Sequence, residues 1–229
     1  MEITLQQLKS VGAHCEGLAL FKNQFGEVLD LPDGWSLAHQ YMMLSCPYWR
    51  RHWGWAVHAR IIPAWSMANI NLCGIDLRGV DLCGADLHWA NLRGVDLNWA
   101  DLCEANLSWA NLIGVNLIDA DLSRADLRRI NLSQADLYRA SLIGANLTRA
   151  DLTEANLSDA NLAYANLTGV NLTRTNLTGA RLAYADLTGV DLSTANLTEV
   201  DLTRTVHREA ASHCLRQKQL LPSPGAEEL

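Results

Sequence analysis

The chain has 229 residues with a formal net charge of −7, and no run of apolar residues approaches the 18 that a membrane-spanning helix needs. The acidic balance argues against direct binding of nucleic acid or of a membrane surface. The first residues lack the basic and apolar regions of a signal peptide, so we expect a cytoplasmic protein whose six cysteines are reduced thiols.

Residues 1–66 show no periodic pattern and are rich in tryptophan. Helical spacing and turn residues predict helices near Thr4–Lys9, Ala13–Phe25, Trp35–Leu44 and Tyr48–Arg60. We interpret this segment as a small helical domain that closes the first coil of the repeat that follows, because an open solenoid end exposes strand edges and core leucines. The alternative is a binding helix at residues 48–60, where arginine and tryptophan are mixed.

A five-residue repeat fills residues 67–205. From Leu72 to Leu202 every fifth residue is leucine, without exception. A step of five turns through roughly 140° on an α-helix, so the leucines would spiral around it and form no stripe. On a strand, an odd step would place successive leucines on opposite faces. The chain must therefore turn a corner within each unit, which predicts a solenoid.

Each unit has the same order of apolar and polar positions. Two residues before the leucine is a small or β-branched residue, which shares the inner face with the leucine in an extended segment. Between them lies an outward residue, which is Asp or Asn except at Ser141 and Arg181. The second residue after the leucine is often glycine, which suits the positive φ of a type II turn. The predicted core is the leucine ladder, which begins with Leu72, Leu77, Leu82, Leu87, Leu92, Leu97, Leu102 and Leu107.

The run from Ala145 to Leu167 repeats the pattern A-[DN]-L-x-x unit after unit, and in this it resembles the pentapeptide-repeat family. The resemblance extends from Ile70 to Arg204. It implies an all-β solenoid, a right-handed quadrilateral β-helix with four units, or 20 residues, in each coil. At that period this chain would form about seven coils.

A 20-residue coil predicts which surface side chains are stacked, because residues 20 apart would lie at the inter-strand spacing of about 4.8 Å. Trp89 then lies beside Trp109, with Arg129 next as a cation–π neighbour. The repeat holds 17 acidic and 10 basic residues, so the negative charge of the chain lies on the rod. The candidate partner surface consists of three corner tryptophans and one acidic column: Trp89, Trp99, Trp109, Asp81, Asp101 and Asp121.

The sequence offers little catalytic chemistry. The repeat contains one histidine, His88, and its acids occupy outward positions where no cleft is expected. Cys46, His52 and His58 match no standard zinc spacing, and we interpret Cys83 and Cys103 as two free thiols in one column. We therefore expect no catalytic site, no metal site and no cofactor, and we predict that the protein is not an enzyme.

Two functions remain. The first is a non-enzymatic scaffold that presents flat acidic faces of the rod to a protein partner, whose identity the sequence does not give. The alternative follows from the resemblance: pentapeptide-repeat proteins of the quinolone-resistance type imitate DNA and bind DNA gyrase or another DNA-binding protein. This chain departs from that type because its repeat has no interrupting loops and all its central residues are leucine.

The repeat fails after Arg204, where His207 takes the position of the next leucine. Residues 206–229 contain an apolar stripe suited to a short helix over the last coil, followed by a tail predicted to be disordered. If that helix does not fold back, two rods could join end to end as a homodimer.

Overall fold

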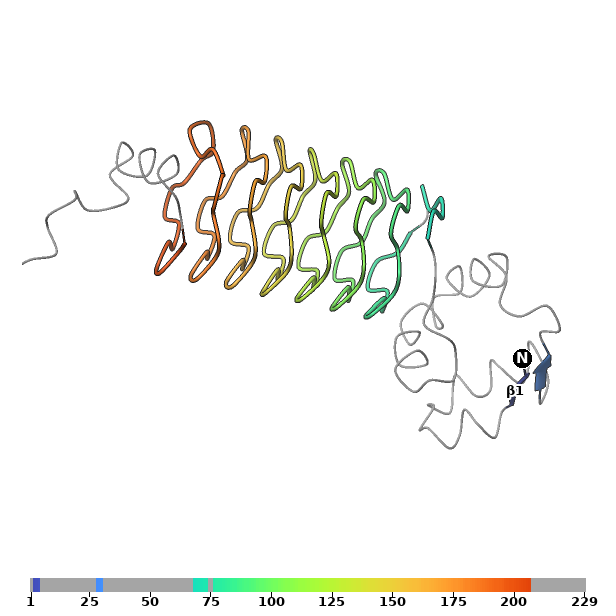
Figure 1. Ribbon diagram of the computed structural model, residues 1–229. Helices are drawn as coiled ribbons and strands as arrows, with labels where there is room; N and C mark the ends of the chain where they lie inside the picture. The colour runs from blue at the N-terminus through green and yellow to red at the C-terminus, as the bar shows by residue number, and fades with distance from the viewer. Residues whose placement is uncertain (1, 5–27, 31–67, 74–75, 207–229) are drawn as a thin grey trace, which may run out of the picture.

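The computed structural model describes residues 2–4, 28–30, 68–73 and 76–206. Most of the predicted N-terminal helical domain and the predicted C-terminal helix lie outside these residues. The other segments of the chain appear in Figure 1 as a thin grey trace. The described part of the repeat begins at residue 68 and ends at residue 206, where the periodic sequence also ends.

Two short strands form near the N-terminus. β1 (Glu2–Thr4) pairs antiparallel with β2 (Val28–Asp30), and Ile3 lies opposite Leu29. Thr4, where the helix near Thr4–Lys9 was expected to begin, is the last residue of β1, and the other residues of that helix lie outside the described residues. β-Branched residues such as Ile3 and Thr4 favour an extended backbone.

The repeat folds into a rod of stacked coils (Figure 1). Parallel bridges join outward residues 20 positions apart, from Asn71 with Asn91 to Asp186 with Val206. One coil therefore contains 20 residues, or four units, and each unit supplies one short side and one corner. The predicted period is confirmed, and the residues that the sequence placed in one column are neighbours across the coils.

Every backbone N–H of a regular unit has a partner, which accounts for the five-residue length. Three N–H groups donate to carbonyls of the adjacent coils, one closes the turn from the preceding unit, and one donates to a side chain. In the unit 120–124 the acceptors are the carbonyl oxygens of Leu117, Ala100, Ser141 and Ile143 and a carboxylate oxygen of Asp121. The coil is thus held together without long strands.

The side-chain acceptor explains why the outward residue is Asp or Asn. In each of the 25 units with Asp or Asn at this position, its Oδ1 accepts the N–H of the residue two further on; examples are Asp121 with Ser123 at 2.8 Å and Asn131 with Ser133 at 3.0 Å. Such a local bond stabilises the corner that follows. Asp and Asn perform the same structural role, so the choice between them sets the surface charge without altering the turn.

The corners have left-handed backbone at the second residue after the leucine. In 25 of the 26 units centred on Leu77 to Leu202 this residue has a φ between 54° and 74°. The N–H of the next residue donates back to the leucine carbonyl, as from Ala85 to Leu82 at 3.0 Å. A negative φ followed by a positive φ is a type II turn, so the prediction drawn from the glycines is confirmed. Most of these residues, however, are large, such as Trp89 and Arg124.

The exception is Thr194. It lacks the positive φ, the bridge between Asn171 and Asp191 is missing, and residues 193–195 form a bend in place of the regular turn. The N–H of Arg174 donates to the Thr194 hydroxyl at 3.1 Å, whereas from Gly79 to Tyr184 every other equivalent N–H donates to a backbone carbonyl of the next coil. Threonine is the only β-branched residue at this position among the described units, and β-branched residues are strongly disfavoured at positive φ.

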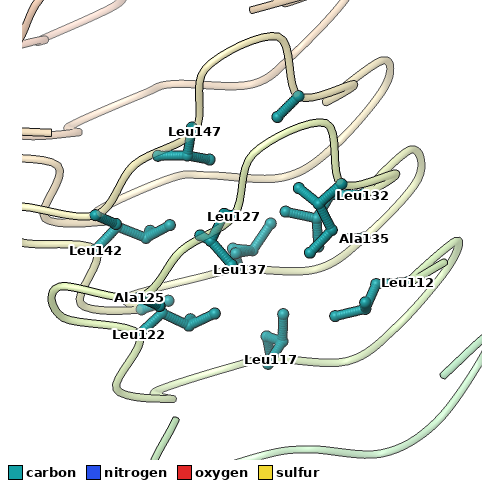
Figure 2. Close-up of a cluster of buried hydrophobic side chains, with 14 of the residues drawn as sticks. Leu112, Leu117, Leu122, Ala125, Leu127, Leu132, Ala135, Leu137, Leu142 and Leu147 are labelled. Carbon is teal, nitrogen blue, oxygen red and sulfur yellow. The ribbon is translucent and has the colours of Figure 1, made fainter. Parts of the chain in front are cut away.

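The core is a column of leucines with smaller residues between them (Figure 2). The eight predicted core residues, Leu72, Leu77, Leu82, Leu87, Leu92, Leu97, Leu102 and Leu107, are all at most 1% exposed. The alanines that precede most leucines are also buried, which keeps the sides of the coil close together. Thr175 is the one polar inward residue in the buried part of the ladder, and its hydroxyl donates to the Leu152 carbonyl at 2.8 Å.

Candidate partner surface

The rod has four faces, which we name after their first described outward residues: the Asn71 face, the Asp76 face, the Asp81 face and the Asp86 face. Each face comprises that residue, every twentieth residue after it, and the two residues that follow the leucine of the same units. Successive units follow one another around the coil, so the Asp76 face is opposite the Asp86 face, and the Asn71 face is opposite the Asp81 face.

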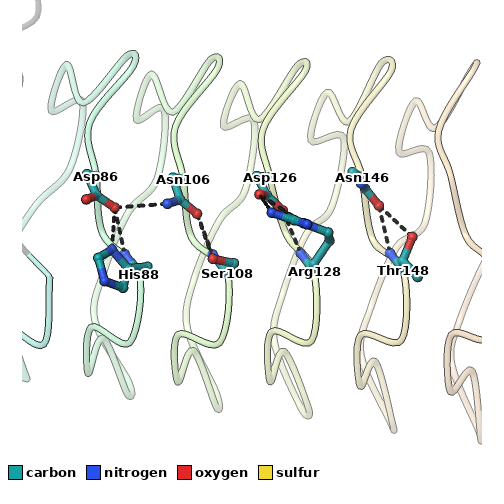
Figure 3. A network of polar contacts seen from close by, with 8 residues as sticks. All are labelled: Asp86, His88, Asn106, Ser108, Asp126, Arg128, Asn146 and Thr148. Carbon is teal, nitrogen blue, oxygen red and sulfur yellow. Dashed lines mark hydrogen bonds and ion pairs between the residues drawn. The ribbon is translucent and has the colours of Figure 1, made fainter.

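The Asp86 face shows how polar side chains are arranged along the rod (Figure 3). Each outward residue bonds to its own unit, as in the pair of Asp126 with Arg128, where Nη2 lies 2.6 Å from Oδ2. The hydrogen bond from Arg128 keeps the pKa of Asp126 below its usual value. The ring of His88 lies 2.6 Å from Asp86, so the single histidine of the repeat is engaged by its neighbour within a surface unit.

The corner of the Asp86 face carries exposed aromatic and cationic side chains in contact with one another. It is formed by Trp89, Trp109, Arg129 and Arg149. The rings of Trp89 and Trp109 are stacked, with centroids 4.9 Å apart and an interplanar angle of 10°. The Arg129 guanidinium lies 4.5 Å from the centroid of the Trp109 ring. Trp89 remains 54% exposed and Trp109 42% exposed. The predicted stack and its cation–π neighbour are therefore confirmed, and we call this surface the Trp89 corner.

The structure does not place Trp99 with the other two tryptophans. It lies ten residues from both Trp89 and Trp109, which is half a coil, so it belongs to the Asp76 face on the opposite side of the rod. It is 62% exposed there. The three tryptophans predicted as one surface are thus two separate features, because spacing in sequence determines the side of the rod on which a residue lies.

The predicted acidic column is present on the Asp81 face. Bridges join Asp81 to Asp101 and Asp101 to Asp121. One oxygen of each carboxylate accepts a backbone N–H in its own unit; for Asp101 the donor is Cys103 at 3.0 Å. The column is therefore partly structural.

The Asp76 face is more acidic than the Asp81 face, which carries the predicted acidic column. It has six acids and two arginines, against five acids and three arginines on the Asp81 face. Its arginines form ion pairs, as in Arg78 with Asp76 at 2.9 Å and Arg139 with Asp119 at 3.2 Å. The acids of the Asp76 face are Asp76, Asp96, Asp119, Asp136, Asp159 and Glu199.

Cys83 and Cys103 are neighbours in one column of the Asp81 face, and both are free thiols. Burial, together with the charge of Asp101 and contact with Cys103, raises the pKa of Cys83 to about 12. Burial and the nearby Asp121 also raise the pKa of Cys103. Because the thiolate is the reactive form, these thiols are poor nucleophiles at neutral pH.

The C-terminal half of the Asp81 face carries an apolar surface that the site prediction missed. The rings of Tyr164 and Tyr184 are stacked with centroids 4.8 Å apart, and the Arg204 guanidinium lies 5.7 Å from the Tyr184 ring centroid. Ile143 is 40% exposed beside them. The signal in the sequence was the pair of outward residues that are neither Asp nor Asn, Ser141 and Arg181, since both lie on this face.

Neither a metal site nor a membrane span is found in the described part of the chain. Within it, no three side chains of His, Cys, Asp or Glu are grouped as metal ligands. No helix there could cross a bilayer. Cys46, His52 and His58 lie outside the described residues.

The repeat matches the model of a known protein family. A family model described as pentapeptide repeats matches eight copies, over residues 66–98, 90–129, 116–153 and 155–193. These segments cover more than half of the chain. The chain belongs to the pentapeptide-repeat family. The quadrilateral β-helix implied by the sequence resemblance is the fold of this family, and the four-unit coil described above agrees with it.

Solved pentapeptide-repeat proteins are similar to this chain over part of its length. One from the Arabidopsis thaliana thylakoid lumen is 31% identical, and the match covers 44% of this chain and 66% of that one, with a TM-score of 0.35. This chain thus spans just under two thirds of the plant protein. HetL from Nostoc, described as involved in heterocyst differentiation regulation, is 33% identical over 66% of this chain and 89% of that one, with a TM-score of 0.21.

QnrB1, a plasmid-mediated fluoroquinolone resistance protein, is 18% identical over 67% of this pentapeptide-repeat chain and 86% of its own, with a TM-score of 0.35. All three TM-scores are below 0.5, so these likenesses add nothing to the family assignment. A search of curated proteins finds no match.

Proposed function

We propose that this pentapeptide-repeat protein is a non-enzymatic scaffold that binds a protein partner through the side of its rod. The observation that carries the proposal is the Trp89 corner. Exposed tryptophan and arginine are the residues most enriched in the energetically dominant centres of protein interfaces. A rigid pair of stacked rings loses little conformational entropy on binding, since their positions are already held by the coils.

The chemistry of this corner favours an acidic or carbonyl-rich partner segment. Arg129 and Arg149 are neighbours in one column, and neither forms an ion pair with an acid of the described residues. Guanidinium groups and indole N–H groups only donate hydrogen bonds, so the corner presents donors beside an apolar stack. A partner with carboxylates next to an apolar side chain would satisfy both.

The test compares two tryptophan variants. The double variant Trp89→Ser/Trp109→Ser removes the corner, and Trp99→Ser on the opposite side of the rod is the matched control. We expect proteins captured from native lysate by the immobilised chain to be lost with the double variant and kept with the control. Equal capture by all three chains, with unchanged circular dichroism, would rule out the corner as the binding surface.

The second candidate is imitation of DNA, which the excess of acids on the rod supports. Duplex DNA carries one negative charge per about 1.7 Å of its axis. A rod of roughly 30 Å, as set by the stacking of its coils, would need about 18 net charges to match it. The repeat has 17 acids but also 10 bases, so its net charge reaches less than half of that density. A supercoiling assay with purified DNA gyrase tests this candidate, and absence of both inhibition and protection at micromolar protein dismisses it.

The finer organisation of the chain is also part of this proposal. We infer that residues 1–66 form a cap of helices together with the β1–β2 pair and that a terminal helix lies within 206–229, because the open ends of a coil stack need covering. We infer about seven coils over residues 67–205, and a cytoplasmic protein because its cysteines are expected to be reduced thiols. Limited proteolysis followed by mass spectrometry tests these boundaries. Stable fragments that end within residues 76–204 would contradict them.

A further inference from the structure

We propose that two copies of this chain associate through their Asp81 faces, with the two rods antiparallel and the two-fold axis at Ser141 and Ile143. This surface is distinct from the Trp89 corner, and the inference does not depend on the partner proposed there. It rests on three observations: a local departure from the repeat, a difference between the two halves of the face, and the way in which a two-fold axis superposes those halves.

The departure is the loss of the turn-stabilising side chain. In 25 units an Asp or Asn oxygen accepts the N–H two residues on, but Ser141 and Arg181 replace it in the other two. No side-chain acceptor is seen for the N–H of Ile143 or Ala183, in contrast to Ala163 between them, which donates to Asn161 at 3.2 Å. Both departures lie on the Asp81 face, two coils apart. Residues that break a local structural rule are expected where the surface has another role.

The two halves of this face differ in chemistry. The N-terminal half is acidic, with Asp81, Asp101, Glu104 and Asp121 among its exposed or half-buried side chains and one arginine, Arg124. From Ile143 to Tyr184 most residues that follow the leucines are apolar or aromatic, and the outward column gains the positive charge of Arg181; the last coil is polar again, with Asp201, Thr203 and Arg204. The apolar and aromatic residues are Ile143, Ala163, Tyr164, Ala183 and Tyr184.

A two-fold axis parallel to the short strands places these halves against each other. It reverses the direction of the rod but lays each column on the same column of the second copy. Asp101 and Arg181 are each two coils from Ser141, on opposite sides of it. An axis at Ser141 therefore sets Asp101 of one copy opposite Arg181 of the other, twice in the dimer.

The corner column of the same face consists of the second residue after each leucine. It gives further complementary pairs about Gly144. Glu104 and Tyr184 are each two coils from it, so a carboxylate faces a phenol that can donate to it. Arg124 and Tyr164 are each one coil from it, so a guanidinium faces an exposed aromatic ring. The tyrosine stack thus has partners in the same register, whereas Asp81 and Asp201, each three coils from Ser141, place two carboxylates opposite each other at each end of the contact.

The middle column of the face, which consists of the first residue after each leucine, favours close approach of the two copies. Ile143 lies on the axis and faces its own copy, which brings two exposed apolar side chains together. The flanking residues Ala163 and Ala183 face Ser123 and Cys103 of the second copy, and all four are small. Because only Ile143 on the axis is bulky among these five residues, this column favours approach to about the 10 Å distance between stacked sheets.

The parallel alternative is distinguished from this arrangement by the charge exchange described next. An axis along the rod would set each outward residue opposite the corner residue of the same coil, so Asp121 would face Arg124 but Asp101 would face Glu104, and Asp101→Arg would strengthen that dimer. The contact surface is about 30 Å long but only a few residues wide. Interfaces smaller than the standard size are weak, so we expect a dissociation constant in the micromolar range.

A charge exchange tests the arrangement in the full chain. Asp101→Arg and Arg181→Asp each place like charges opposite one another at two symmetry-related positions, so each should raise the dissociation constant by on the order of a hundredfold. The combined variant restores opposite charges and should recover the dimer. The matched control is Asp136→Arg, which removes the same turn-stabilising carboxylate from the Asp76 face. Sedimentation velocity from 1 to 200 µM measures the association.

The outcomes separate this dimer from the others. A wild-type dimer that is lost in both single variants, kept in Asp136→Arg and recovered in the double variant supports the proposal. A wild-type monomer throughout the concentration range overturns it. A dimer that tolerates both single variants but is lost when residues 207–229 are removed also overturns it, because the rods then join end to end.

Discussion

The corners of the regular coils and the corner at residues 191–195 are built from the same five-residue unit, but they have different backbones. In the regular units the second residue after the leucine is left-handed, whether it is Gly114 or the bulky Trp109. At Thr194 the left-handed conformation is absent, although Leu192 is as deeply buried as the other leucines. The buried leucine therefore does not determine the corner.

The difference shows that the unit has two separate determinants. The leucine and its small neighbour fill the core, whereas the branching of the corner residue decides whether the turn forms. Large unbranched residues are accepted at the corner because their N–H groups bond to the next coil, as from Trp109 to Arg128 at 3.0 Å. A hydroxyl near the backbone offers an alternative acceptor, which Thr194 supplies to Arg174.

The largest effect should come from the core. Leu127→Ala in a middle coil removes a fully buried side chain and should reduce the free energy of unfolding by about 2–5 kcal/mol. Leu202→Ala should reduce it less, because Leu202 is only partly buried. Urea denaturation followed by circular dichroism measures both. Equal losses at the two sites would show that burial does not set the contribution of a leucine.

Moving the irregular corner into a regular coil should have the next largest effect. Gly114 lies in the same corner column as Thr194, and a Cβ added there meets nothing within 4 Å, so the effect of substitution comes from φ alone. Gly114→Thr should destabilise the rod by roughly 1–3 kcal/mol. The control Gly114→Asn should lose clearly less, because asparagine tolerates left-handed backbone. If the two variants unfold at the same urea concentration, β-branching is not the cause.

The reverse change should regularise the last corner. Thr194→Asn gives a residue that accepts positive φ and removes the competing hydroxyl, so we expect a gain of about 0.5–1 kcal/mol. Amide hydrogen exchange should then slow at Leu172, whose regular partner would be the carbonyl of Asp191. Unchanged exchange at Leu172 would mean that the irregular corner has another origin.

A smaller gain is expected where the turn-stabilising side chain is missing. Arg181→Asn supplies an acceptor for the N–H of Ala183 and should stabilise the rod by about 0.5 kcal/mol or slightly more. The same change removes a proposed dimer contact, so stability and association should move in opposite directions. Thermal unfolding at low concentration and sedimentation at high concentration measure the two effects. A variant that is both less stable and fully dimeric would contradict both assignments.

The reactivity of the thiols should depend on pH. With a pKa of about 12, Cys83 holds its proton through neutral and mildly alkaline pH, and its thiolate fraction rises only as pH approaches that value. Iodoacetamide should therefore modify Cys83 much more slowly than free glutathione at pH 8. Asp101→Asn keeps the turn but removes a negative charge, so it should accelerate the reaction. Peptide mass spectrometry measures the rate, and a Cys83 rate equal to that of glutathione would be contrary to this account.

Much of the fold could be predicted from the sequence because nearly every unit of the repeat has the same pattern of residues. The leucine step predicted the core, and the 20-residue coil predicted the bridges, the Trp89–Trp109 stack and the position of Arg129 over Trp109. The left-handed corners were expected from glycine but occur mostly without it. Sequence preference alone could not show this, because the cross-coil hydrogen bonds that hold such residues in place exist only in the folded rod.

The candidate surface was less predictable. Trp99 was grouped with Trp89 and Trp109 by nearness in sequence, although a step of ten residues already implies the opposite side of a four-sided coil. The sequence shows that Ser141 and Arg181 differ from the Asp or Asn of the other units. It does not show the hydrogen bond that Asp and Asn make to their own turn, so it gives no reason to regard the two exceptions as more than polar substitutions.

Because the outward Asp or Asn bonds to the turn of its own unit, each unit can be lost or gained without loss of the turn, and this affects how such a gene can change. Loss or gain of five codons would leave a foldable ladder but rotate everything downstream by a quarter of a coil, so every surface column would be joined to a different one. Loss or gain of twenty codons would shorten or lengthen the rod and keep each column in phase. Length and surface pattern can therefore be inherited separately, and only insertions in whole coils preserve both the Trp89 corner and the Asp81 face.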